Sequence, residues 1–207
     1  YGQTETINIV GNFPGVETRF GSMGKPVPGF DINVVDDNGK ILPDGEVGHI
    51  AICTEKKWPP GLFHGYLQNK VIVKDSFRHG WYYTGDTASR DKDGYLWFVG
   101  RSDDLISSAG YRISPFEVES ALLEHDLIAE SAVVGVPDET RGQLVKAYIV
   151  LVEGYKGSNE LIREIQDFCK NLTAPYKYPR KVEFVDSLPK TISGKIRRVE
   201  LREIENK

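Results

Sequence analysis

The feature that most constrains the fold is a change of sequence pattern between residues 95 and 119. Before this stretch, short apolar alternations separated by Gly and Pro are typical of strands and turns, whereas after it helical spacing alternates with further strands. The polar run RSDD at 101–104 lies between the two patterns and has no apolar residue to anchor it. We therefore expect an α+β chain made of two units, residues 1–102 and residues 103–207.

The second unit opens with a helix-start signal. Ser114 and Glu117 form the S-x-x-E pattern of a capping box, and Pro115 occupies the first helical position. We expect a helix at 115–124, strands at 130–136, 145–152 and 181–185, a turn at Pro137-Asp138, and a second helix at 159–172. The apolar face of that second helix consists of Leu161, Ile165, Phe168 and Leu172.

The pattern of the first unit predicts antiparallel strands, and the end of one of them carries a residue that could bind a ligand. Strands are expected at 31–35 and 47–52, with a turn at 37–39. A third strand at 81–84 is expected to end at Gly85, which lets the carboxylate of Asp86 approach a ligand. Such a carboxylate can accept two hydrogen bonds from a vicinal diol such as ribose. The alternative is that Asp86 only initiates a turn.

The segment Asp91-Lys92-Asp93-Gly94 resembles a calcium-binding loop only superficially. When Gly94 is aligned with the glycine of such a loop, Gly100 stands where a bidentate Glu is required. We expect a hairpin turn here and no calcium site.

Composition excludes several classes of protein. No apolar run approaches the roughly 20 residues of a membrane-spanning helix. The chain begins at Tyr1 with neither a basic leader nor an apolar signal core, and the lack of an initial Met suggests a fragment. Cys53 and Cys169 lie far apart in periodic segments, so we expect reduced core thiols rather than a disulfide or metal site. A cytoplasmic protein without a membrane span fits these features.

Charge is unevenly distributed along the chain. The net charge is −4, but residues 177–202 contain eight Lys or Arg and three acidic residues. A basic segment on an acidic protein favours a compact phosphate-bearing ligand over a long nucleic-acid track, which usually needs a wide basic patch. Two alternatives are a solvated basic helix end and a nucleic-acid binder.

The first six residues, YGQTET, are polar and have no apolar spacing, which suits a turn that lines a ligand. Thr hydroxyls can donate to a phosphate or a carboxylate. Glu5 can reach Mg²⁺, which prefers hard oxygen ligands beside nucleotide phosphates. The alternative is an ordinary polar chain terminus.

A second chemical signal is the segment LPKTISGKIRR at 188–198. Thr191, Ser193 and Gly194 predict a turn that presents Lys195. The segment is not a phosphate-binding P-loop, because Ile196 stands where Ser or Thr binds the metal. We interpret Lys195 as a single cation that acts as a point charge on a reaction centre.

Four motifs, YGQTET, YYTGD, GRSDDLISSAGYR and PKTISGKIRR, occur in this order. Together they resemble the adenylate-forming enzymes: acyl-CoA synthetases, aryl-CoA ligases, luciferases and adenylation domains. SPFEVESAL, VPDETRGQLVKAYIVL and TAPYKYPRKVEFV are most similar to medium-chain acyl-CoA synthetases. The resemblance covers the C-terminal part of such an enzyme. It implies a distorted antiparallel barrel at 1–102, the end of the large adenylation domain, and a mobile lid at 103–207 with a sheet of about three strands.

The resemblance implies an acid–thiol ligase that forms acyl-AMP and pyrophosphate from a carboxylate and ATP. Asp86 would hold the ribose hydroxyls with help from Arg101, and Glu5 would hold Mg²⁺. Thr4 would touch the α-phosphate or the carboxylate, and Lys195 would bridge these two anions. The implied catalytic residues are Lys195, Thr4 and Glu5, and the implied nucleotide-binding residues are Gly2, Gln3, Thr4, Asp86, Arg101 and Lys195.

The resemblance also implies a second half-reaction in which CoA displaces AMP. The lid would swing about Asp103, withdrawing Lys195 and bringing the Gly110 loop to the active site. The implied CoA-binding residues are Ala109, Gly110, Tyr111, Arg112, Arg141 and Arg180. Ala109 departs from the pattern, because relatives often carry Ser there.

The implied substrates are a small carboxylate, ATP and CoA, with Mg²⁺ as the metal and no tightly bound organic cofactor. No nucleic-acid partner is expected, and in a eukaryote the location would be the mitochondrial matrix. An acetyl-CoA or aryl-CoA ligase and a non-catalytic binding module are the alternatives. We expect the fragment alone to be inactive.

Overall fold

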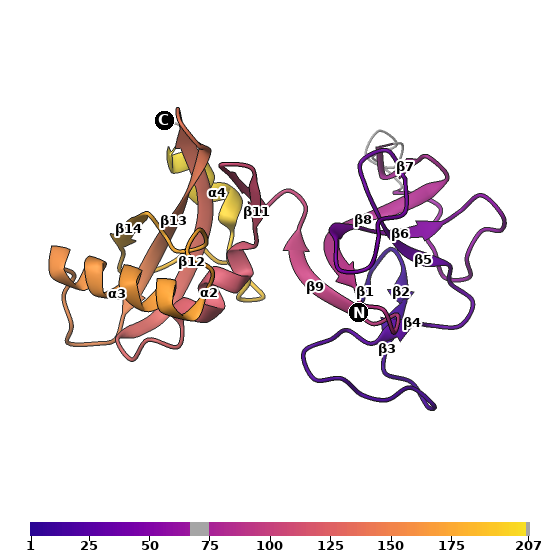
Figure 1. Cartoon of the computed structure of the whole chain (residues 1–207), viewed down its shortest axis with the longest axis horizontal. Coiled ribbons are helices and arrows are strands. Elements are labelled where there is room, and N and C mark those ends of the chain that lie inside the picture. Colours follow the sequence, from indigo (N-terminus) through magenta and orange to yellow (C-terminus); the bar gives the residue numbers. More distant parts are fainter. Residues whose placement is uncertain (67–74, 206–207) are drawn as a thin grey trace. The chain divides into compact units, whose positions relative to one another are not determined.

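The computed structural model describes residues 1–66 and 75–205. The chain divides into two compact units, Tyr1–Asp103 and Asp104–Lys207 (Figure 1). This boundary lies one residue after the expected one. Each unit has its own hydrophobic core, as expected of parts that fold around separate layers of secondary structure.

The first unit is built around one antiparallel sheet in the strand order β5-β6-β8-β7, with β9 also paired to β8. Its strands are β5 (Ile32–Val35), β6 (Val47–Cys53), β7 (Phe77–Arg78), β8 (Trp81–Arg90) and β9 (Leu96–Arg101). The expected strands at 31–35 and 47–52 are therefore confirmed. The expected α+β class is confirmed. The expected distorted antiparallel barrel is not closed among the described residues, because β5 pairs only with β6. Closure would need a continuous hydrogen-bonded ladder between the two edges.

Two short strand pairs accompany this sheet. β1 (Gly2–Gln3) pairs with β2 (Ile7–Asn8), and β3 (Val10–Gly11) pairs with β4 (Lys25–Pro26). The hairpin turn expected at Asp91 is confirmed, since its backbone carbonyl accepts from the Gly94 N–H at 2.9 Å and its Oδ1 accepts from the Tyr95 N–H at 2.9 Å. This turn joins β8 to β9.

The second unit contains a five-stranded sheet in the order β11-β10-β13-β12, with β14 parallel to β13. Its strands are β10 (Ile106–Ser108), β11 (Tyr111–Ile113), β12 (Ile128–Asp138), β13 (Gly142–Leu151) and β14 (Lys181–Phe184). The sheet is larger than the expected three strands because β10 and β11 form a small hairpin at its edge. Strands of three residues are too short to show an alternating pattern.

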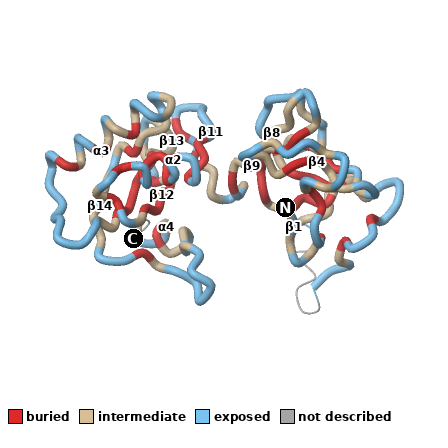
Figure 2. The backbone as a smooth tube through the Cα atoms, turned by 90° about the horizontal axis from the view of Figure 1, so that it is seen from below, coloured by how far each residue is buried: buried red, intermediate tan, exposed pale blue. Residues whose placement is uncertain are grey.

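Three helices cover this sheet: α2 (Pro115–Leu122), α3 (Asn159–Leu172) and α4 (Arg198–Glu205). Residues of α2 and α3 share one core with Val133, Ala147 and Ile149. Leu201 of α4 belongs to another core with Val134 and Tyr148. Because neighbouring strand residues point to opposite faces, the sheet is covered on both sides, and Figure 2 shows α3 and α4 on opposite sides of β12.

The helix predictions are largely confirmed. Ser114 caps α2 by accepting from the Glu117 N–H at 3.4 Å, and the Glu117 carboxylate accepts from Lys177. α3 has the expected bounds, but its buried stripe is Leu161, Ile165 and Cys169. Leu172 is exposed because it lies in the last turn of α3, at the end of the core.

The turn expected at Pro137-Asp138 is wrong, because β12 continues through both residues and pairs them with Gln143 and Gly142. Pro is tolerated there because β12 is at the end of the strand order, where a missing N–H costs no ladder hydrogen bond. Both cysteines are free thiols, with Cys169 buried and Cys53 half-buried. Among the described residues, no helix is long and apolar enough to cross a membrane.

Candidate active site

Asp86 lies on a bulge in the middle of β8. Tyr83 pairs with Ala51 and Thr87 pairs with His49, so three residues of β8 oppose Ile50 alone. Gly85 supplies the positive φ of 80° that the bulge needs. The expectation that the strand ends at Gly85 is therefore wrong: the strand continues, and the extra residues redirect the side chain of Asp86. Bulges that redirect a side chain are common next to active sites.

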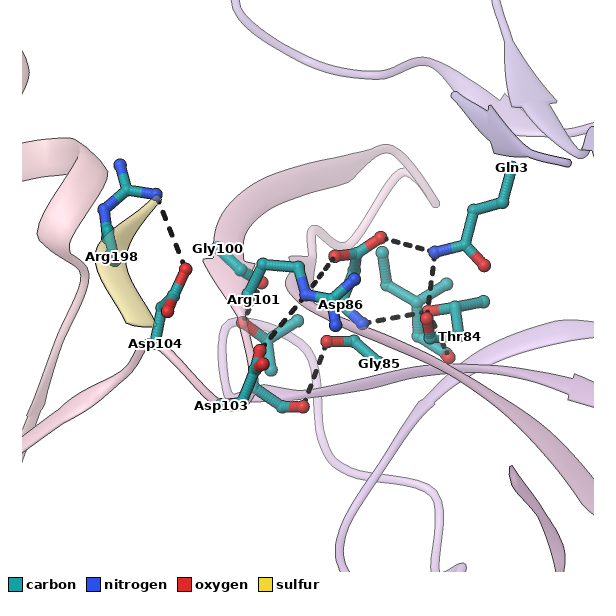
Figure 3. Close-up of polar contacts among 12 residues, drawn as sticks. Gln3, Thr84, Gly85, Asp86, Gly100, Arg101, Asp103, Asp104 and Arg198 are labelled. Atoms are coloured by element: carbon teal, nitrogen blue, oxygen red, sulfur yellow. Dashed lines mark hydrogen bonds and ion pairs between the residues drawn. The ribbon is translucent and has the colours of Figure 1, made fainter. Parts of the chain in front are cut away.

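The Asp86 carboxylate is held by two donors from the first three residues of the chain. Tyr1 Oη donates to Asp86 Oδ2 at 2.5 Å, and Gln3 Nε2 donates to the same oxygen at 2.8 Å. Gln3 also donates to the Thr84 carbonyl at 2.8 Å (Figure 3). The Asp86 side chain is 9% exposed. Because Oδ2 carries both bonds, Oδ1 keeps acceptor capacity for a vicinal diol.

Burial raises the pKa of the Tyr1 hydroxyl, and its bond to Asp86 raises it further. Tyr1 therefore stays protonated and acts as the donor to Asp86 at neutral pH. The sequence reasoning did not single out Tyr1. Its position directly before Gly2 and Gln3 could have indicated it, because the residue next to this hairpin is carried toward the same site as Gln3.

Arg101 lies directly opposite Asp86 in the β8–β9 register. Its Nε is 3.1 Å from Asp103 Oδ1 and 3.8 Å from Asp86 Oδ1 (Figure 3). Ser102 fastens the same strand end, since its N–H and hydroxyl both donate to the Gly85 carbonyl, at 2.9 and 3.0 Å. Within the first unit, Arg101 therefore contacts both Asp86, the predicted ribose-binding acid, and Asp103, the predicted pivot.

The YGQTET segment is a tight hairpin in which β1 and β2 are joined by Thr4, Glu5 and Thr6. Thr6 is fully buried, and its hydroxyl accepts from the Gln3 N–H at 3.1 Å. This bond closes the turn and leaves Thr4 exposed. Because Gln3 reaches Asp86, the hairpin and the bulge form one site.

Glu5 is half-buried beside the hairpin. Tyr66 Oη donates to its carboxylate, and this bond raises the pKa of Tyr66 to about 12. Within 1–66 and 75–205 no three His, Cys, Asp or Glu side chains cluster as a metal cage. A single carboxylate fits Mg²⁺, which is commonly bound by one or two carboxylates together with substrate phosphates.

Lys195 projects from a hydrogen-bonded hairpin in the second unit. The Thr191 N–H donates to the Lys195 carbonyl at 2.8 Å, and the Lys195 N–H donates back to Thr191 Oγ1 at 3.1 Å. Gly194 takes the left-handed conformation, with φ of 81°, at the turn. Lys195 itself is exposed, so its ammonium group is available to an anion.

The Gly110 loop is the two-residue turn between β10 and β11. Ala109 and Gly110 both have positive φ, 50° and 84°, as a type I′ turn requires. The Ala109 N–H donates to the Arg141 carbonyl at 2.9 Å, so the turn lies beside the end of β13. Tyr111 stacks on Tyr176 with ring centroids 4.1 Å apart. Among the described residues, and apart from its two chain neighbours, nothing lies within 4 Å of a Cβ built on Gly110, so the backbone there faces open space.

The three predicted CoA arginines have different surroundings. Arg112 is exposed on β11 and Arg141 is half-buried beside the Ala109 turn. Arg180 precedes β14, where its guanidinium donates to the Tyr178 hydroxyl at 2.9 Å. The structure therefore brings Arg141 to the Gly110 loop and gives Arg180 a separate partner.

Two family models place the chain in the AMP-binding enzyme family. Residues 1–67 match the family model described as AMP-binding enzyme, and residues 117–195 match the model of the AMP-binding enzyme C-terminal domain.

Named relatives are similar along almost the whole chain. It is 60% identical over 206 residues to 4-hydroxybutyrate–CoA ligase 1 of Metallosphaera sedula, covering 99% of this chain and 36% of that protein. It is 56% identical to mitochondrial acyl-coenzyme A synthetase ACSM3 of Mus musculus, with the same coverage. The chain thus spans about a third of the length of these relatives.

Solved structures agree in fold. The anthranilate CoA ligase AuaEII in complex with anthranoyl-AMP is 41% identical with a TM-score of 0.84, over 99% of this chain and 39% of that one. The ATP-bound RpMatB-BxBclM chimera B1 is 35% identical with a TM-score of 0.84, over 99% of this chain and 40% of that one.

Proposed function

We propose that this chain is the C-terminal region of an ATP-dependent acyl-CoA synthetase. The enzyme forms acyl-AMP and pyrophosphate from a carboxylate and ATP, and CoA then displaces AMP to give acyl-CoA. The observation that carries this proposal is the Asp86 carboxylate, held at a β-bulge by Tyr1 and Gln3 with one oxygen left as an acceptor. The names of the relatives and the AMP-binding family models support the same reaction class.

In the first half-reaction, Asp86 accepts hydrogen bonds from the ribose hydroxyls and Arg101 assists. Gly2, Gln3 and Thr4 line the nucleotide, because they form the hairpin that Gln3 fastens to Asp86. Glu5 would hold Mg²⁺ together with the ATP phosphates, and the ion would supply positive charge to neutralise the departing pyrophosphate.

Lys195 reaches the nucleotide as a point charge in this half-reaction. The attacking carboxylate and the α-phosphate are both anionic, so a cation between them offsets their repulsion as the bond forms. The hairpin at Thr191 sets the direction in which Lys195 projects. No protein nucleophile is required, because the substrate carboxylate attacks phosphorus itself.

In the second half-reaction, the unit that begins after Asp103 acts as a mobile lid on the end of the large adenylation domain. Asp103 is the pivot, and the turn at Ala109 and Gly110 guides the CoA thiol. The open space beside Gly110 supports this role, since pantetheine needs close approach to a backbone. The other proposed CoA contacts are Tyr111, Arg112, Arg141 and Arg180.

The proposed partners are a small carboxylate, ATP and CoA, without nucleic acid. The proposed location is the cytoplasm, or the mitochondrial matrix if the protein is eukaryotic. The word mitochondrial in the name of the mouse relative supports the second location.

The test joins this chain to the N-terminal part of the Metallosphaera sedula ligase, in place of the matching segment of that enzyme. We expect the joined protein to convert 4-hydroxybutyrate, ATP and CoA to the thioester and AMP. Neither part alone should do so, because the nucleotide site needs both. The parent ligase and a Lys195→Ala version of the joined protein serve as controls. A joined protein that melts cooperatively like the parent but forms neither acyl-AMP nor thioester overturns the proposal.

A further inference from the structure

Asp104, the first residue of the second unit, is tied to helix α4 near the other end of the chain. Arg202 Nη1 donates to Asp104 Oδ1 at 2.6 Å. Arg198 Nη1 approaches Asp104 Oδ2 at 3.4 Å, as Figure 3 shows. The Asp104 side chain is 14% exposed. A largely buried carboxylate with two arginine partners holds its geometry better than an exposed ion pair.

Arg198 extends this contact into the core of the second unit. Its Nη2 and Nε donate to the two oxygens of Glu119, at 2.6 and 3.1 Å. Glu119 Oε1 also accepts from the Val133 N–H at 2.8 Å, so Arg198 is anchored to both α2 and β12. The Glu119 side chain is only 7% exposed, and burial raises its pKa despite the arginine.

Only a short segment separates the Lys195 hairpin from Arg198 and its ion pairs with Asp104 and Glu119. Lys190 and Ile196 form a β-bridge, and the Arg197 N–H donates to the Pro189 carbonyl at 2.9 Å. α4 begins at the next residue, Arg198. Three residues after Lys195 the chain is therefore pinned to Asp104 and Glu119, and Asp104 directly follows the proposed pivot residue.

We propose that Asp104, Glu119, Arg198 and Arg202 are positioning residues that fix the Lys195 hairpin relative to the pivot, so that rotation about Asp103 places the ammonium group at the α-phosphate. This inference rests on the proposed function. Without the cluster, α4 would stay attached at its far end, where Glu205 accepts from Lys146 and Tyr148. The first turn of α4, which is nearest Lys195, would no longer be held in place. Small misplacements at a reacting centre cost large factors in rate.

The experiment uses the full-length joined ligase with the substitutions Asp104→Asn, Arg202→Gln and Arg202→Lys. Glu205→Gln is the matched control, because it removes an ion pair of the same helix at the end away from Lys195. ATP–pyrophosphate exchange reports adenylation, and thioester formation from supplied acyl-AMP reports the second half-reaction. Melting temperatures are measured for every variant.

We expect Asp104→Asn and Arg202→Gln to lower kcat for exchange by about tenfold to a hundredfold, with little change in KM for ATP. Thioester formation from supplied acyl-AMP should change by less than about threefold, because that step does not use Lys195. Arg202→Lys should recover most of the exchange, since it restores a cation opposite Asp104. Glu205→Gln should lower the melting temperature but leave exchange unchanged.

A double substitution separates positioning from general destabilisation. In a Lys195→Ala background, Asp104→Asn should cause no further loss of the residual exchange, because the side chain that it positions is already gone. This inference alone is overturned if Asp104→Asn lowers the exchange rate by the same factor in the Lys195→Ala background as in the wild-type background. It is also overturned if Asp104→Asn by itself leaves the exchange rate unchanged. Full exchange activity in Lys195→Ala itself would instead contradict the proposed function.

Discussion

Arg101 Nε lies 3.1 Å from Asp103 Oδ1, at the last residue of the first unit. The same nitrogen is 3.8 Å from Asp86 Oδ1, and Arg101 is paired with Asp86 across β8 and β9. The arginine therefore contacts both the proposed ribose acid and the proposed pivot acid. On the proposed function, a nucleotide bound at Asp86 would compete for Arg101 and so would alter the contact of Arg101 with Asp103.

Replacing Lys195 should separate the two half-reactions. Lys195→Ala in the full-length ligase is expected to lower pyrophosphate exchange by at least about a hundredfold, because a charge that offsets two anions is lost. Thioester formation from supplied acyl-AMP should remain largely intact. Lys190→Ala, at the base of the same hairpin, is the control and should retain exchange. Equal losses in both half-reactions would contradict the assignment.

Removing the Tyr1 hydroxyl should weaken nucleotide binding. Tyr1→Phe leaves Asp86 with one donor fewer on Oδ2 and is expected to raise KM for ATP by about tenfold, equivalent to about 1.4 kcal/mol. Tyr83→Phe is the matched control, since its hydroxyl donates to the Asp36 carbonyl at 3.3 Å and not to Asp86. An unchanged KM in Tyr1→Phe would show that this bond does not orient the carboxylate.

Blocking the Gly110 turn should impair the thiol step. Gly110→Leu is expected to slow thioester formation from acyl-AMP while leaving pyrophosphate exchange near its normal rate. Gly154→Leu is a control with similar backbone strain, because Gly154 has φ of 90°. As at Gly110, no described residue other than its chain neighbours lies within 4 Å of a built Cβ. If both variants lose thioester formation equally, strain rather than a blocked thiol path is responsible.

Stiffening the pivot should impair whichever half-reaction needs the less populated orientation. Asp103→Pro restricts φ at the proposed pivot, so one of the two half-reactions should slow by about tenfold or more. Asp103→Ala separates this effect from the loss of the contact with Arg101. If the proline and alanine variants have the same rates, rotation does not occur at this residue.

The stability that Glu205 contributes by holding the end of α4 should depend on pH. Hydrogen bonds from Lys146 and Tyr148 lower the pKa of Glu205 below its ordinary value of 4.5. A lowered pKa in the folded state stabilises the protein above pH 4.5, and this stability is lost as the pH falls through the folded-state value. Glu205→Gln should therefore lower the melting temperature at pH 7 by several degrees, for a loss of about 1 kcal/mol. The difference from the wild-type chain should shrink progressively below pH 4.5, and a constant difference would contradict it.

Local sequence signals predicted the elements whose structure depends on near neighbours. The helix at 159–172 was predicted to the residue, because its apolar spacing lies within one short stretch. The structure shows that Ser158 caps it. The Asp91 hairpin turn and the Ser114 cap are equally local. For the candidate site, the motifs indicated the residues that we propose carry the chemistry, namely Asp86, Glu5 and Lys195.

The tertiary structure alone decided how these residues are held. Strand pairing opposite Ile50 creates the bulge at Gly85, and β8 in isolation gives no sign of it. Tyr1 reaches Asp86 across 85 positions, and Arg202 reaches Asp104 across 98. Contacts at such separations depend on how strands register and how helices pack, and the same residues could satisfy many local patterns. Sequence therefore determined the chemical groups and the local turns, whereas long-range packing determined which of those groups meet.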